Sequence, residues 1–253
     1  MFHINKVQIL VIVIFAVSLF FILKINQENV EYSNGNVDCN LVYQGKNAKV
    51  NVVFLPYGYS DEKRFFEDVD SYVNGEFGFR NVEPFKSNFE SFSFYDIVSE
   101  NIKCDVTDNT FICEDLSAKR AAANCPNDYI IVLYDRDAIR DLIVPIRSSA
   151  YLNLASINTA DHRLVVLHEF GHIYGGLADE YVEEGIDIDI DRFQNCDVKN
   201  CPRWSHLTNS GCFEGCGEIN FYRSIDNGIM KNYIIGREFG IWNEYLLALP
   251  LQS

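Results

Sequence analysis

Two histidines four residues apart in a strongly apolar stretch constrain this chain more than any other feature. His168 and His172 lie within residues 161–176, a stretch that predicts a buried helix ending at the glycine pair Gly175 and Gly176. Residues four apart on a helix share one face, so both imidazoles can bind the same ion. Two stacked histidines in a core need partners, which weakens the alternative that they are ordinary core or surface residues.

Glu169 follows the first histidine and completes an H-E-x-x-H pattern. Two neutral imidazoles and one further ligand hold Zn²⁺ while leaving a fourth position open for water. The ion lowers the pKa of that water to about 7, and Glu169 is placed beside the histidine face to act as general base. The pattern therefore predicts one catalytic Zn²⁺ ion, with His168 and His172 as ligands.

The third ligand must come from another part of the chain. Asp179 is the best candidate, because the glycines after the helix let the backbone turn back beneath the ion. Glu180 and His206 stay open as alternatives. His162 lies about two helical turns before the motif, too far along the axis to share the ion, and His3 precedes an apolar N-terminal segment.

Residues 168–181 resemble the signature of the IgA-peptidase-like zinc metallopeptidases, a metzincin-related family. In that signature H-E-x-x-H is followed by x-x-x-G-x-x-D-E, which Gly176, Asp179 and Glu180 match. The resemblance implies that Asp179 replaces the histidine that usually serves metzincins as third ligand. Typical metzincins place that ligand one residue earlier, at Ala178 here, which keeps Glu180 open.

The same resemblance implies a fold and a second structural element. The fold is an α/β, metzincin-like zincin domain with a mixed, mostly parallel sheet, a zinc-binding helix and a loop-rich, disulfide-bearing C-terminal part. Met230 would belong to the tight turn beneath the zinc ion, although a methionine that merely fills a gap is the alternative. Tyr233 is a candidate transition-state stabiliser, one residue later than the position used by some metzincins.

The chain has an even number of cysteines, which in an exported protein indicates up to four disulfides. The eight are Cys39, Cys104, Cys113, Cys125, Cys196, Cys201, Cys212 and Cys216. Cys196 with Cys201 and Cys212 with Cys216 are spaced for small local loops, and crossed pairings are equally allowed. A second zinc ion on these four is disfavoured, because their spacing lacks the usual C-x2-C pairs.

An apolar run at residues 7–23, flanked by Lys6 and Lys24, predicts an uncleaved membrane anchor, with a cleaved signal peptide as the alternative. Both interpretations send the rest of the chain out of the cytoplasm, either held at the cell membrane or secreted. We expect three regions: an anchor or signal segment at 1–24, a stalk at 25–47 and a zinc metallopeptidase domain at 48–253.

Apolar runs and helical spacing alternate through the first two thirds of the chain, as in a mixed α/β domain. The predicted strands are 50–55, 92–98, 128–134 and 149–156, and the predicted helices besides the zinc helix are 60–73 and 84–89. The formal net charge of −15 argues against nucleic acid as a partner and against docking of the domain on an anionic membrane. The membrane is therefore expected to be contacted only through the N-terminal segment.

The sequence favours a zinc-dependent endopeptidase that acts on a peptide or protein substrate outside the cytoplasm, with Glu169 as general base. We expect the substrate to lie extended and to pair with the strand near residues 149–156. The first alternative is a membrane-tethered binding or adhesion module with a structural zinc site. A weaker one is a zinc hydrolase of non-peptide amides. The oligomeric state stays open.

Overall fold

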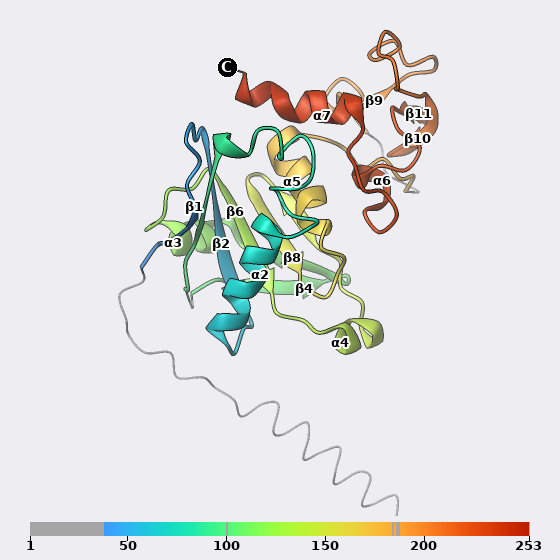
Figure 1. The fold of residues 1–253 in the computed structure, drawn as a ribbon. Helices are drawn as coiled ribbons and strands as arrows, with labels where there is room; N and C mark the ends of the chain where they lie inside the picture. Colours follow the sequence, from blue (N-terminus) through green and yellow to red (C-terminus); the bar gives the residue numbers. More distant parts are fainter. Residues whose placement is uncertain (1–37, 100, 184, 186–187, 253) are drawn as a thin grey trace, which may run out of the picture. The chain divides into compact units, whose positions relative to one another are not determined.

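The computed structural model describes residues 38–99, 101–183, 185 and 188–252. A six-stranded sheet with the strand order β1-β3-β2-β6-β8-β7 forms the framework (Figure 1). Its strands are β1 (Asn40–Tyr43), β2 (Val50–Tyr57), β3 (Phe92–Asp96), β6 (Tyr129–Tyr134), β7 (Ser149–Tyr151) and β8 (Leu154–Asn158). The four inner strands are parallel, and β1 and β7 close the two edges in antiparallel orientation. The sheet is thus mixed and mostly parallel, as predicted.

The helices lie on both faces of this sheet and in the C-terminal part. Their bounds are α2 (Glu62–Asn74), η1 (Phe89–Ser91), α3 (Asp115–Ala122), α4 (Ala138–Ile143), α5 (Val165–Gly175), α6 (Ile229–Asn232), α7 (Ile241–Ala248) and η2 (Leu249–Leu251). In β2, Val52 and Phe54 pack in the same core as α2 and α5, whereas Val53 and Leu55 pack with α3 on the opposite face. Because successive side chains of a strand point to opposite faces, a run that is apolar at every position makes a strand covered on both sides.

Several local predictions are confirmed and two are wrong. The predicted strands 50–55, 92–98 and 128–134 correspond to β2, β3 and β6, whereas 149–156 is two strands joined by a short turn. The predicted helix 84–89 is irregular: residues 84–88 form turns, and Phe89 begins the short η1. The helix predicted at 60–73 is α2, which begins at Glu62 because Asp61 is its N-cap: the Asp61 side chain accepts a hydrogen bond from the Lys63 amide.

Residues after α5 are mostly irregular and carry one small sheet. Its strands are β9 (Cys196–Asp197), β10 (Phe213–Cys216) and β11 (Glu218–Arg223), in the order β10-β11-β9. A separate hairpin of β4 (Cys104–Thr107) and β5 (Thr110–Cys113) lies between β3 and α3 in the chain. The prediction of a loop-rich, disulfide-bearing C-terminal part is therefore confirmed.

All eight cysteines pair, in four disulfides. The pairs are Cys39–Cys125, Cys104–Cys113, Cys196–Cys216 and Cys201–Cys212. The sequence left the pairing of the last four cysteines open, and the local pairs Cys196 with Cys201 and Cys212 with Cys216 do not form. The last two bridges are nested instead: Cys201–Cys212 lies within the chain segment that Cys196–Cys216 closes. Four disulfides are consistent with an extracellular or secreted protein.

The domain begins earlier than its predicted boundary at residue 48. Strand β1 lies inside the segment 25–47 assigned to a stalk, and Cys39 is already tied to Cys125. Across the part of the chain that the structure describes, no helix is long and apolar enough to cross a membrane. The predicted anchor or signal segment at 1–24 lies outside the described residues.

Candidate metal centre

The helix α5 carries both histidines of the motif and ends where the sequence predicts. Its cap, Gly176, has the left-handed conformation with φ of 61°, and its amide donates to the carbonyl oxygens of Gly171 and His172. A side chain at this φ is strained even where space is open, so glycine fits here. The cap turns the chain back along α5 and brings Asp179 to the histidines.

Three donor atoms converge on one point. The Nε2 atoms of His168 and His172 lie 3.2 Å apart, and Asp179 Oδ1 lies 3.1 and 3.3 Å from them. Donors held about 2.0–2.1 Å from one tetrahedral zinc ion are separated by about 3.3 Å. Among the described residues, this trio is the group of histidines, cysteines and acids able to hold a metal ion. The donor set therefore fits Zn²⁺ in both chemistry and spacing.

Hydrogen bonds at the far side of each ring fix which nitrogen faces the centre. His168 Nδ1 lies 3.0 Å from the carbonyl oxygen of Ile229, and His172 Nδ1 lies 2.7 Å from that of Leu177. A carbonyl only accepts, so both Nδ1 atoms carry the hydrogen and both Nε2 lone pairs face inward. Asp179 Oδ1 is buried between these two Nε2 atoms. Three acceptors that face one point can hold a cation between them, either a proton or a metal ion.

The same crowding perturbs the protonation of the trio. Burial opposes charge on His172, but the hydrogen bond and charge of Asp179 prevail and raise its pKa to about 9. Burial likewise opposes ionisation of Asp179, yet the two histidines hold the pKa of its carboxyl well below the usual range. Without a metal ion, His172 therefore keeps a second proton at neutral pH, paired with the Asp179 carboxylate, and a bound dication would replace that proton.

Glu169 lies beside the centre but not within the ligand trio. Its carboxyl is buried, which raises its pKa, while the two neighbouring histidines act in the opposite direction. It lines the same cavity as the three candidate ligands. A carboxylate at this place can exchange protons with a water or substrate in the cavity.

The alternatives for the third ligand are not brought to the trio. Glu180 is fully buried, and its Oε1 accepts from Asn243 at 2.7 Å and from Asn195 at 3.4 Å. His206 is exposed in the C-terminal part and is absent from the cluster. Of the three candidates named from the sequence, Asp179 alone meets the histidines.

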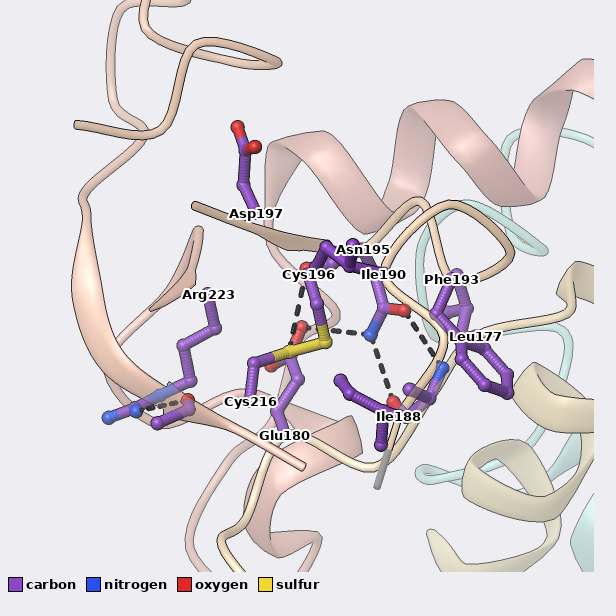
Figure 2. The surroundings of a disulfide bond; sticks show 12 residues. Leu177, Glu180, Ile188, Ile190, Phe193, Asn195, Cys196, Asp197, Cys216 and Arg223 are labelled. Atoms are coloured by element: carbon purple, nitrogen blue, oxygen red, sulfur yellow. Dashed lines mark hydrogen bonds between the residues drawn. A yellow bond between two sulfur atoms is a disulfide. The ribbon is translucent and has the colours of Figure 1, made fainter. Parts of the chain in front are cut away.

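A buried asparagine that sequence reasoning missed holds the backbone before Asp179. The Asn195 side chain accepts from the Ala178 amide at 2.8 Å and donates to the Ala178 carbonyl at 2.9 Å. Figure 2 shows this amide between the Leu177 segment and Glu180, next to the Cys196–Cys216 disulfide. Its only sequence signal was its position beside a cysteine, which says nothing about its target.

Met230 is fully buried against the helix α5. A Cβ atom built at Gly171 would lie 2.7 Å from Met230 Sδ, so the glycine between the two histidines is what permits this contact. The Met230 carbonyl also accepts from the Glu180 amide at 2.9 Å. Residues 229–230 therefore lie against the motif helix and the turn that carries Asp179.

Tyr233 lies next to His168, with ring centroids 5.1 Å apart, but its hydroxyl donates to Asp161 at 2.7 Å. Burial raises the pKa of the Tyr233 hydroxyl, and the charge of Asp161 acts in the same direction. Another tyrosine, Tyr181, lines the cavity and interacts with Asp179, and burial raises its pKa as well. Tyr181 is a site residue that sequence reasoning missed, because it lies beyond the motif.

The three candidate ligands open on a cavity of about 690 Å³. One wall is the edge strand β7 with Leu152, and another is the loop that carries Arg192 and Phe193. A smaller hollow of about 230 Å³ adjoins it beside His172, bordered by Leu177, Ile188 and Phe193. The centre is therefore accessible to a ligand rather than sealed within the core.

Comparison with models of known protein families and with curated proteins found no match.

Proposed function

We propose that this protein is a zinc-dependent peptidase that hydrolyses peptide bonds outside the cytoplasm. The observation that carries the proposal is the set of three inward-facing acceptors on His168, His172 and Asp179, at tetrahedral spacing and open to a cavity that Glu169 also lines. A structural zinc site has no need of an open side or of a buried carboxyl next to it.

A zinc ion held by these three residues would supply Lewis acidity toward the scissile carbonyl and the attacking water. Glu169 accepts the proton of that water at its carboxylate and delivers it to the leaving amine. The carbonyls of Ile229 and Leu177 keep the protons of His168 and His172 on Nδ1, away from the reacting groups. The three residues that would bind the zinc ion are thus distinct from Glu169, the residue that transfers protons.

The edge strand β7 supports an extended substrate. It pairs with β8, and among the described residues no other strand pairs with Ser149–Tyr151, although Thr110 of β5 forms one bridge with Arg147 just before β7. Its residues Ser149, Ala150 and Tyr151 line the cavity of the metal centre. A peptide that adds as a further strand would satisfy the free backbone groups of β7 and lie across the centre. The smaller apolar hollow would then receive one of its side chains.

The family-level prediction of a metzincin-type domain draws support from local geometry. The left-handed glycine after α5, the aspartate three residues later and the methionine packed on Gly171 agree with the arrangement that the resemblance implies. We extend the proposal to a zincin domain with Met230 in the turn below the zinc. Tyr181 is the better candidate than Tyr233 for contact with substrate, because it lines the cavity.

The test compares the oxidised full chain with its Glu169→Gln variant on a diverse peptide library read by mass spectrometry. Zinc content is measured for each protein, and Glu67→Gln, which removes an exposed carboxylate of α2, is the matched control. We expect one zinc ion per chain in all three, with cuts by the wild type and by the control only. A zinc-loaded wild type that cuts no peptide would refute the proposal and favour a binding module, and cleavage confined to non-peptide amides would favour the other hydrolase.

A further inference from the structure

Two arginines line the cavity of the metal centre from different walls. Arg147 precedes the edge strand β7, and Arg192 belongs to the loop before β9. Both side chains are exposed. Within the described ranges, neither has a carboxylate oxygen within 4.0 Å, whereas other arginines such as Arg64, Arg163 and Arg223 do.

The backbone of Arg147 is fixed although its side chain is exposed. Its amide donates to the Asn109 carbonyl at 2.7 Å, and its own carbonyl accepts from the Phe111 amide at 2.9 Å. These two bonds tie the residue to the β4–β5 hairpin, immediately before the strand along which we place the substrate. The guanidinium is thus carried by a rigid backbone while its donors stay available to a ligand.

Arg192 is held differently. Its amide donates to the Asp189 carbonyl at 3.0 Å, and its guanidinium lies over the ring of Phe193, 5.2 Å from the centroid. Phe193 itself lines both the cavity and the smaller hollow. Stacking on an aromatic ring orders an arginine without using its hydrogen-bond donors, so the planar group can still bind a carboxylate.

The charge of the cavity differs in sign from that of the chain. The positive charges of Arg147 and Arg192 balance the negative charges of Glu169 and Asp179. A bound dication would therefore give the cavity lining a net positive charge, whereas the whole chain has a formal net charge of −15. Charges more than about 8 Å away are largely screened at physiological ionic strength. A substrate in the cavity therefore responds to the local arginines rather than to the overall charge.

We propose that the cavity selects peptides that carry Asp or Glu next to the cleaved bond, with Arg147 and Arg192 as the recognising groups. This inference rests on the proposed function in that it takes the ligand of the cavity to be a peptide. A carboxylate side chain accepts two parallel hydrogen bonds from a guanidinium, a geometry that a neutral amide cannot reproduce. Each arginine therefore contributes to selection, not only to affinity.

The test measures binding separately from cleavage. The zinc-loaded full chain with Glu169→Gln is titrated with fluorescent peptides that differ only in Glu, Gln or Lys at positions beside the central bond. The same peptides are titrated against Arg147→Gln, Arg192→Gln and the double variant in that background. Arg120→Gln, which removes an exposed arginine of α3 that does not line the cavity, is the matched control. Circular dichroism and zinc content establish that each variant is folded and loaded.

We expect the Glu peptide to bind about tenfold more tightly than the Gln peptide, and each single variant to reduce that preference about three- to fivefold. The double variant should abolish the preference for the Glu peptide, and added salt should weaken this preference. Arg147→Lys should retain more of the preference than Arg147→Gln does. Equal affinity for the Glu and Gln peptides, or an unchanged preference in the double variant, would overturn the inference.

Cleavage of the library by the wild type distinguishes this failure from that of the proposed function. Cuts without enrichment of Asp or Glu sink the inference and leave the peptidase intact. Selective binding of acidic peptides without any cut leaves the recognition intact and sinks the peptidase. If the protein makes no cuts and shows no selective binding, both the peptidase proposal and the inference are refuted.

Discussion

Replacing Asn195 with alanine should weaken zinc binding even though Asn195 is not a ligand. Its amide clamps both backbone groups of Ala178, at 2.8 and 2.9 Å, and Asp179 is the next residue. The side chain is fully buried, so water cannot take over these bonds. The shortened side chain would leave the turn that presents Asp179 free to move.

The size of the effect follows from the bonds that are lost. Two buried main-chain groups lose their partner at about 1–2 kcal/mol each, and Glu180 loses its weaker 3.4 Å bond. The free energy of unfolding should therefore fall by about 3 kcal/mol in the zinc-free protein. A residue that orients a ligand typically changes metal affinity 10- to 100-fold on removal, so the zinc dissociation constant should rise by about that factor.

Competition with a chromophoric chelator gives the zinc affinity, and urea unfolding in the presence of a chelator gives the stability. The matched control is Asn127→Ala, because the Asn127 side chain also hydrogen-bonds two backbone groups, donating to the carbonyls of Ala122 and Cys125, but lies outside the centre. The control should lose stability and keep its zinc affinity. If Asn195→Ala loses stability yet binds zinc within twofold of the wild type, the clamp does not position Asp179 and the reasoning fails.

Three further outcomes follow from the same structure. Burial raises the pKa of Glu180 from 4.5 to about 7. The protonated Glu180 carboxyl therefore stabilises the folded state fully below about pH 4.5, and this contribution is lost as the pH rises through about 7. Urea unfolding from about pH 5 to pH 8 should show a decline of about 2–3 kcal/mol in the wild type relative to Glu180→Gln; parallel curves would contradict this. Gly176→Ala should cost about 1 kcal/mol in the same assay, because φ is 61°, and Gly176→Asn should cost less. Replacing Cys196 and Cys216 with serine should lower the free energy of unfolding by about 3 kcal/mol and weaken zinc binding, whereas loss of the β4–β5 hairpin disulfide should leave zinc affinity unchanged.

The central sheet was predictable because its signals are local. Strands β2 and β6 are apolar at consecutive positions, which only a strand covered on both faces tolerates at that length. The turn that divides residues 149–156 was missed, because Leu152 adopts φ of 54° without a glycine to announce it. The helix expected at 84–89 failed because a proline start and mixed apolar residues do not set a helical period.

The candidate metal centre was predictable to the extent that its proposed ligands lie on one helix. Spacing alone assigned His168 and His172, since a helix fixes which residues share a face. Spacing could not decide between Asp179 and Glu180, which are adjacent and equally able to bind a metal. Contacts distant in sequence decide it, because Glu180 is drawn to Asn195 and Asn243 while Asp179 turns to the histidines. Disulfide pairing stayed open from the sequence for the same reason, because the bridges join residues brought together by tertiary contacts.

Different parts of the chain supply the donors and their orientation. The helix α5 provides the two imidazoles, but their tautomers and the position of the third ligand depend on groups after it, namely the Ile229 carbonyl, the Asn195 amide and the Met230 side chain. None of these groups is placed by a regular helix longer than one turn, and the Cys196–Cys216 bridge lies next to Asn195. A preorganised centre needs supporting groups that do not move. The disulfide-bearing C-terminal part is therefore an integral component of the candidate metal centre, and we expect zinc affinity to depend on its correct folding.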